Sequence, residues 1–352
     1  MQTSSAPSRP LNISLFLLAG LWILVANRLA DSAANGIGGH VPVLLQPLLE
    51  PVFLLFLLYL GLSAIARMGN RGGEAHLVDG LPQRVSSREE WLRGISLGWL
   101  IALVAVVPMM LVGALHPEFW LGPRNWAPAI LSVVAIAIGT LASEIAFRGF
   151  LYKRLIAGTG VVVATIVVSL IYALASIIHP NSNWLSMAVA FSASVLLCVA
   201  FQRTNALWVS WGIHFGWAAT TAVLLGLPTA GDASLCTIIT TSAEGANWLT
   251  GGPYGPDGAF LTLAIHLLAI VPLYYFTRDY AWRYTHMEIL PGGVPVVIAP
   301  PAAHTEMEDA AAARPAPLVQ ILSTTSSRPS TMPAIEEHLR KEQGAPLDGT
   351  ED

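Results

Sequence analysis

The sequence contains few charged residues. Of its 352 residues only 11% are Asp, Glu, Lys or Arg, whereas 54% are hydrophobic. Soluble domains have about a quarter charged residues, so water is not the main solvent of this chain. The net charge of −4 is small, and the basic residues form no patch interleaved with aromatic side chains. We therefore expect no nucleic-acid partner.

Cysteine is also scarce. The chain has two cysteines, Cys198 in an apolar run and Cys236 in a polar stretch. This arrangement gives no support to a disulfide framework, a CxxC redox pair or a thiolate zinc site. We expect one packed thiol and one loop thiol.

Long apolar runs, by contrast, are abundant. A bilayer core about 30 Å thick needs roughly twenty helical residues to cross it. Segments that approach or meet this length run approximately over residues 11–28, 41–66, 92–115, 127–157, 160–179, 185–201, 205–226 and 259–277. The predicted fold class is therefore all-α, a polytopic transmembrane bundle of about eight helices. The segment 185–201 is short and Ser-rich, and every later span would invert if it were interfacial.

Basic residues predict the orientation of the spans, because Lys and Arg in short loops are retained on the cytoplasmic side. With the N-terminus in the cytoplasm, the connections on that side hold Arg9, Arg67, Arg71, Arg84, Arg88, Arg93, Lys153, Arg154, Arg203, Arg278 and Arg283. The opposite side keeps Arg124, with Arg28 at a helix edge. We expect both termini to lie in the cytoplasm.

Four regions follow from this reading. Residues 1–10 form a cytoplasmic leader and residues 11–284 a transmembrane helical domain. Within that domain, the loop 228–258 lacks Lys and Arg and is expected on the non-cytoplasmic side. Residues 285–352 are rich in Pro, Ala, Ser and Thr and have too few large apolar residues to form a core, so we expect a disordered cytoplasmic tail.

Ionisable residues at membrane depth are costly, so each is a candidate for a functional site or for a structural polar contact. The candidates are Glu50, Glu144, Arg148, His179, His214 and His266. Glu144 and Arg148 are spaced i and i+4 and share a helix face, where they can form an ion pair. Glu50 stands beside Pro51, where a helix kink is expected, and His266 could bond to a neighbouring helix.

The turn at residues 158–160 gives a measure of depth. Counting outward from it at about 1.5 Å per residue, Ser143 and Ser176 stand at nearly equal heights, and Glu144 is close to that level. His179 should lie almost one turn above Ser176 on the same face, and His214 toward the middle of the bilayer. We expect helices four, five and seven to build one polar site.

At these positions the chain resembles the CPBP family of intramembrane proteases, which includes CAAX prenyl endopeptidases and bacteriocin-processing or bacteriocin-immunity membrane proteins. The resemblance is carried by Ser143 to Arg148, by Tyr172 to His179 and by Asn205 to Ala218, over a core of about residues 127–226. The loop from Trp248 to Gly258 is similar to that of one bacterial subgroup. The resemblance implies a CPBP-like helical fold in the lipid bilayer of a bacterial plasma membrane, and a membrane-embedded or prenylated peptide as substrate.

The sequence departs from the family pattern at the residues that carry the chemistry. The family has an adjacent Glu-Glu, then a His on the next helix, then His-xxx-Asn. Ser143 stands in place of the water-activating first Glu, Ser176 in place of the His, and Ala218 in place of the Asn. Glu144, Arg148 and His214 remain. A serine hydroxyl cannot replace a carboxylate as base unless another group deprotonates it.

These departures leave several hypotheses. In the first, an intramembrane hydrolase with a shifted site uses Glu144 as base, while His214 and His179 bind metal or stabilise the oxyanion. Glu144, His179 and His214 could supply three ligands to a zinc ion if the difference of one turn in height is absorbed, but the resemblance does not imply zinc, and the cofactor stays open. In the second, which we favour, the chain is impaired or inactive, a pseudoenzyme that binds a peptide or serves as an immunity or scaffold protein. A small-solute transporter ranks third, since we find neither inverted repeats nor paired broken helices.

Overall fold

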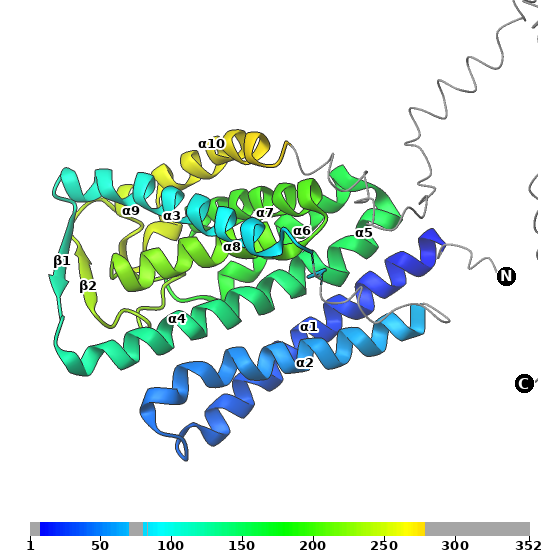
Figure 1. Ribbon diagram of the computed structural model, residues 1–352, viewed down its shortest axis with the longest axis horizontal. Coiled ribbons are helices and arrows are strands. Elements are labelled where there is room, and N and C mark those ends of the chain that lie inside the picture. The colour runs from blue at the N-terminus through cyan, green and yellow to red at the C-terminus, as the bar shows by residue number, and fades with distance from the viewer. Residues whose placement is uncertain (1–7, 70–79, 83, 279–352) are drawn as a thin grey trace, which may run out of the picture. The chain divides into compact units, whose positions relative to one another are not determined.

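The structure is a computed structural model that describes residues 8–69, 80–82 and 84–278. All eight predicted apolar segments are helical within this part of the chain (Figure 1). The helices are α1 (Arg9–Gly38), α2 (Gln46–Gly69) preceded by the short η1 (Val43–Leu45), α3 (Ser87–Leu111), α4 (Pro123–Glu144) continued by η3 (Ile145–Phe150) and α5 (Leu151–Thr159), α6 (Val161–Ala175) with η4 (Ser176–Ile178), α7 (Trp184–Thr204), α8 (Leu207–Ala219) with η5 (Thr220–Leu224), and α10 (Phe260–Phe276).

Six of these segments are long and apolar enough to cross a membrane, and α10 is a shorter apolar helix. The Ser-rich segment 185–201 lies within α7, which is among the six. Leu17, Leu21 and Leu24 on α1 are each 60–64% exposed, so the outer surface of this helix is itself apolar. Lipid is the solvent that such a surface requires. The all-α membrane fold is confirmed.

A small sheet was not predicted. β1 (Leu115–Phe119) pairs antiparallel with β2 (Ile239–Ala243), with Leu115 opposite Ala243, and Figure 1 shows the pair at one end of the bundle. Gly113, whose φ is +73°, ends the turn after α3, so the predicted span 92–115 stops short of its last residues. Three further short pieces, α9 (Asn247–Thr250), η6 (Gly252–Tyr254) and η7 (Pro256–Gly258), give the loop 228–258 a folded structure.

Several helix ends differ from those predicted. α1 runs ten residues beyond the expected end at Arg28, because Leu-, Ala- and Asn-rich sequence continues to Gly38 without a proline. α2 continues through Pro51. The turn at residues 158–160 is where the sequence placed it, with Gly160 at a φ of +89° that favours glycine. The leader residues 1–7 and the tail 285–352 lie outside the described residues.

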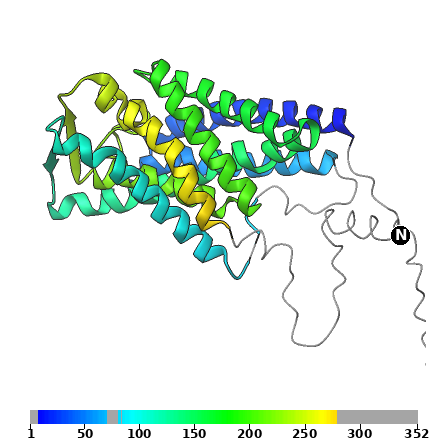
Figure 2. The same cartoon turned by 90° about the horizontal axis from the view of Figure 1, so that it is seen from above.

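The closest helix pair is α3 with α8. A Cβ atom added at Gly98 would stand 2.2 Å from the carbonyl oxygen of Ile213, and one added at Gly212 would stand 2.4 Å from that of Trp91. Small residues let membrane helices approach in this way. In Figures 1 and 2, α10 lies along α3 and α7, which completes this half of the bundle.

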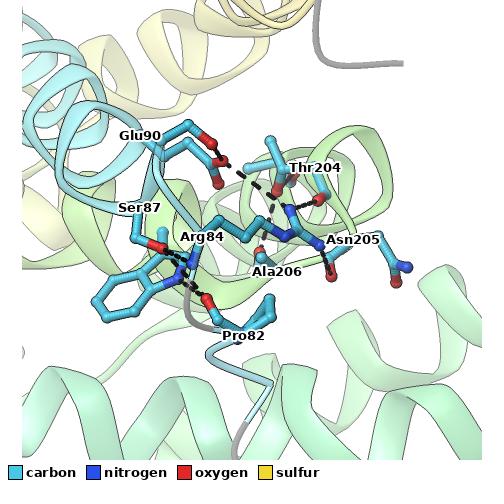
Figure 3. Close-up of polar contacts among 10 residues, drawn as sticks. Pro82, Arg84, Ser87, Glu90, Thr204, Asn205 and Ala206 are labelled. Atoms are coloured by element: carbon cyan, nitrogen blue, oxygen red, sulfur yellow. Dashed lines mark hydrogen bonds and ion pairs between the residues drawn. The ribbon is translucent and has the colours of Figure 1, made fainter. Parts of the chain in front are cut away.

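The start of α3 is fastened to the junction of α7 and α8. Arg84 donates from Nη1 to the carbonyl of Thr204 at 2.9 Å and from Nη2 to that of Asn205 at 3.3 Å (Figure 3). A cation on these terminal carbonyls also complements the dipole of α7. The indole of Trp208 donates to the carbonyl of Pro82 at 3.0 Å. The helix that carries His214 is thereby held in place at its first turn.

Candidate functional site

A buried charged group joins α4 to α8. Glu144 Oε1 accepts a hydrogen bond from Arg148 Nη1 at 3.2 Å and another from His214 Nδ1 at 2.9 Å. Glu144 and Arg148 are fully buried, and the His214 side chain is 18% exposed. The predicted ion pair is therefore present and includes the histidine. Because Nδ1 binds the carboxylate, only Nε2 of His214 remains for other partners.

A π-helix sets the direction of Arg148. η3 spans Ile145–Phe150, and Gly149 within it has a ψ of −113°, outside the helical range. Such π-bulges concentrate at functional sites. The guanidinium carbon of Arg148 lies 4.6 Å from the centre of the Tyr172 ring, a cation–π contact that helps to hold the charge in the core.

The motif positions meet at one cavity of about 430 Å³. Ser143, Ser176, His214 and Ala218 all line it, whereas Glu144 and Arg148 do not. The expected convergence of helices four, five and seven is thus observed. The Glu144 carboxylate, however, lies behind the cavity wall with one oxygen engaged by Arg148 and His214.

His179 does not occupy the expected helix face. The helix ends at Ile178, and His179 has extended backbone, with φ −74° and ψ 144°. The physical reason is Pro180, since a residue before proline is disfavoured in the α conformation. His179 is exposed and lines the cavity near its rim.

The three residues considered for zinc are therefore not gathered. Glu144 is fully buried and His179 is exposed. Within the described residues, no group of three or more His, Cys, Asp or Glu side chains is placed to hold a metal ion. The donor set does not fit a zinc site.

The loop 228–258 also lines the cavity, and none of its lining residues was predicted as a site residue. Tyr254 and Asp257 line it. Asp257 accepts hydrogen bonds from the Trp217 indole and from the backbone N–H of Ala230, both at 2.9 Å. Gly255 allows this fold, because its φ is +85° and a Cβ there would stand 2.0 Å from the carbonyl oxygen of Pro228.

Burial also changes the acidity of these loop groups. Desolvation raises the pKa of Asp257, and its two N–H donors oppose that effect only in part. Desolvation, together with the nearby Asp257, raises the pKa of Tyr254 to about 12. Tyr254 therefore stays protonated at neutral pH and presents a hydroxyl beside those of Ser176 and Ser186. The one sequence signal for these residues was the similarity of the loop to that of a bacterial subgroup.

The two remaining candidates have different surroundings. His266 Nδ1 is hydrogen-bonded to Ser192 Oγ of α7 at 3.2 Å, and its ring packs edge-on to Trp217. The expected bond to a neighbouring helix is confirmed. Glu50 lines the cavity from α2.

The cavity wall offers limited chemistry. The Ser176 hydroxyl donates to the carbonyl of Ala173 at 2.7 Å, Ala218 has no polar atom, and Ser143 has no acidic or basic side-chain group. His214 Nε2 is the only unpaired basic atom at the positions where the family places its catalytic groups. General acid–base catalysis needs a base within about 3 Å of the water or proton it acts on, and Glu144 is separated from the cavity.

These observations define a multi-pass helical membrane protein whose buried Glu–Arg–His group supports a protease-like cavity. The sequence model of one family, type II CAAX prenyl endopeptidase Rce1-like, matches residues 124–220. This range contains every motif position discussed above except the loop residues. No curated protein sequence matches the chain. The resemblance to CAAX-type intramembrane proteases is confirmed over the matched residues.

Proposed function

We propose that this protein binds a membrane-embedded or prenylated peptide in its cavity and does not hydrolyse it through a Glu- and His-activated water. The observation that carries the proposal is the division of the site into two parts. Ser143, Ser176 and Ala218 face the cavity, whereas the Glu144 carboxylate lies behind it and is engaged by Arg148 and His214.

Both halves of the reaction are weakened at the positions of the family motifs. Ser143 places a hydroxyl where the family has its water-activating carboxylate, so no carboxylate base stands at that position. Losing one oxyanion donor costs about a hundredfold to a thousandfold in rate, and Ala218 and Ser176 replace two polar groups that the family pattern expects. The cavity itself is intact and lined largely by apolar side chains such as Leu54, Leu58 and Val189, which suits an apolar chain.

The proposal includes a location in a bacterial plasma membrane with both termini in the cytoplasm. The orientation is supported by basic residues near helix ends that bond to the ends of neighbouring helices. Arg84 binds the end of α7, Arg203 donates to Thr277 after α10, and Arg154 of α5 donates to Asn12 at the start of α1. A reporter enzyme that is active only in the cytoplasm should be active when fused after α10. Activity of a reporter that works only on the opposite side of the membrane would refute the orientation.

The test measures binding and cleavage on one sample. Purified protein in phosphatidylcholine nanodiscs would be titrated with a fluorescent farnesylated peptide and then assayed for peptide products. We expect saturable binding without cleavage. Ala193→Trp, which fills the cavity from α7, should abolish binding, whereas Leu170→Trp, on the exposed side of α6, should leave it unchanged.

A variant that restores the family pattern serves as the catalytic comparison. Ser143→Glu/Ser176→His/Ala218→Asn supplies the missing base and donors to the same cavity. Cleavage by this variant and not by the wild type is the supporting result. Cleavage by the wild type that is lost in Glu144→Gln would show that the site is active and would refute the proposal.

A further inference from the structure

The cavity has an unbalanced set of charges. Among the described residues that line it are two carboxylates, Glu50 and Asp257, and the three imidazoles of His179, His214 and His266. None of the lining residues is Lys or Arg. Arg148, a buried cation on η3, lies outside the lining and is paired with Glu144. A ligand in this cavity therefore meets two carboxylates and three imidazoles, but no Lys or Arg side chain of the wall.

Both carboxylates interact electrostatically with His179, which also lines the cavity. Asp232 of the loop also acts on Glu50. The Thr229 hydroxyl, buried and without a hydrogen-bond partner among the described residues, belongs to the same lining.

The position of Asp257 is fixed by its hydrogen bonds. Oδ1 accepts from Trp217 on α8 and Oδ2 from Ala230 of the loop. Each carboxylate oxygen can accept about two hydrogen bonds, so both oxygens keep accepting capacity for a ligand donor. Much of the remaining lining is formed by apolar residues of α1, α2 and α7, among them Ile23, Leu58 and Leu196. The cavity lining is thus amphipathic, with many apolar side chains and two carboxylates.

We infer that the ligand of this cavity is an amphiphile whose polar end is cationic, an amine, and that a ligand ending in a free carboxylate is disfavoured. This inference rests on the proposed binding function and names the chemistry of the bound end. An ammonium group in the cavity can bind Asp257 or Glu50 with charge-assisted hydrogen bonds. A carboxylate in the cavity is repelled by these groups, and like charges held together in a binding site carry a large penalty.

The experiment compares three farnesylated peptides that differ only in their C-terminal group. One ends in a carboxylate, one in a neutral amide and one in an aminoethyl amide. Each would displace the fluorescent peptide from wild-type protein in phosphatidylcholine nanodiscs at pH 7, with empty nanodiscs as the background. We expect the amine to bind on the order of tenfold or more tightly than the carboxylate, with the neutral amide between them.

Three charge variants locate the preference. Asp257→Asn and Glu50→Gln should each reduce the ratio of amine to carboxylate affinity several-fold. Glu118→Gln removes the same charge from the exposed strand β1, outside the cavity, and should leave the ratio unchanged. Because Asp257 also anchors the loop, its variant is interpreted only with an unchanged melting temperature. If the melting temperature of Asp257→Asn changes, the preference is tested by Glu50→Gln alone, because Glu50 has no such anchoring bond among the described residues.

The outcomes separate this inference from the function beneath it. Equal or tighter binding of the carboxylate peptide, still abolished by Ala193→Trp, would overturn the cationic preference and leave the binding function standing. An equal loss of preference in Glu118→Gln would also overturn it, because the effect would then come from overall charge. Failure of all three peptides to bind would refute the proposed function itself.

Discussion

Removing the Arg148 guanidinium should destabilise the protein strongly. In Arg148→Met the side-chain volume is nearly kept, but Glu144 loses a cation whose nitrogen lies 3.2 Å away. At an effective dielectric constant of about 20, that pair attracts by about 5 kcal/mol. Deleting one partner of a buried pair typically costs about 3–5 kcal/mol, because the other charge stays buried. We expect a loss in this range, with His214 compensating in part.

The double variant Glu144→Gln/Arg148→Met is the matched control. It removes both charges, and replacing a buried ion pair by uncharged groups of similar volume is often close to neutral. Unfolding in mixed micelles, followed by tryptophan fluorescence, would give the free energy of each variant. We expect the double variant to be more stable than Arg148→Met. If the separate effects of Glu144→Gln and Arg148→Met on the unfolding free energy simply add in the double variant, or if Arg148→Met costs less than about 1 kcal/mol, the buried charge is not what holds this site.

Four further outcomes are expected. Gly98→Ala, whose Cβ would meet a backbone carbonyl of α8 at 2.2 Å, should cost about 1–3 kcal/mol or more of unfolding free energy, whereas Gly139→Ala, with its nearest atom at 3.8 Å, should be tolerated. Arg84→Ala should lower the unfolding free energy by about 1 kcal/mol through loss of its bonds to the end of α7; an unchanged melting temperature would contradict this. Burial raises the pKa of Cys236 to about 11, so iodoacetamide at pH 8 should label it about a hundredfold more slowly than a thiol of pKa 9, in a variant lacking the other cysteine. Burial raises the pKa of Asp257, so protonation of Asp257 favours the folded loop. Protection of the loop amides from hydrogen exchange should therefore be greatest in acid and fall as the pH rises above about 4 through the folded pKa. Asp257→Asn should not show this pH dependence.

The helices could be predicted because each depends on a local property. Runs of about twenty apolar residues suffice to place spans, and Gly158 to Gly160 marks a turn whatever surrounds it. The ends were predicted less well for equally local reasons. The sequence contains the signal for the extended backbone of His179, which is Pro180 after it. The prediction nevertheless placed His179 on the helix, which ends one residue earlier at Ile178. The β1–β2 pair has no such signal, since its strands are joined across more than a hundred residues.

The candidate site also has features that local spacing predicts and features that depend on the three-dimensional arrangement. The meeting of Ser143, Ser176, His214 and Ala218 at one cavity follows from spacing on helices of known depth. The place of Asp257 does not, because it depends on glycine turns and on bonds to Trp217 and Ala230 that no periodicity encodes. Glu144 was rightly paired with Arg148, but only the three-dimensional arrangement shows that its carboxylate lies behind the cavity wall.

The same arrangement explains how a protease scaffold can keep its fold while its cavity changes. Glu144, Arg148 and His214 depend on one another, so removing any one leaves a buried charge or donor without its partner, at a cost comparable to much of a domain's stability. Ser143, Ser176 and Ala218 face the cavity and take part in no such charged group. Substitution at these three positions alters what the cavity can bind or transform without removing a member of the buried charged group. Ser143→Glu adds a carboxylate at membrane depth, which has a cost of its own, so the restored triple variant should lose some stability. Arg148→Met should unfold more readily still, with every cavity-facing side chain unchanged.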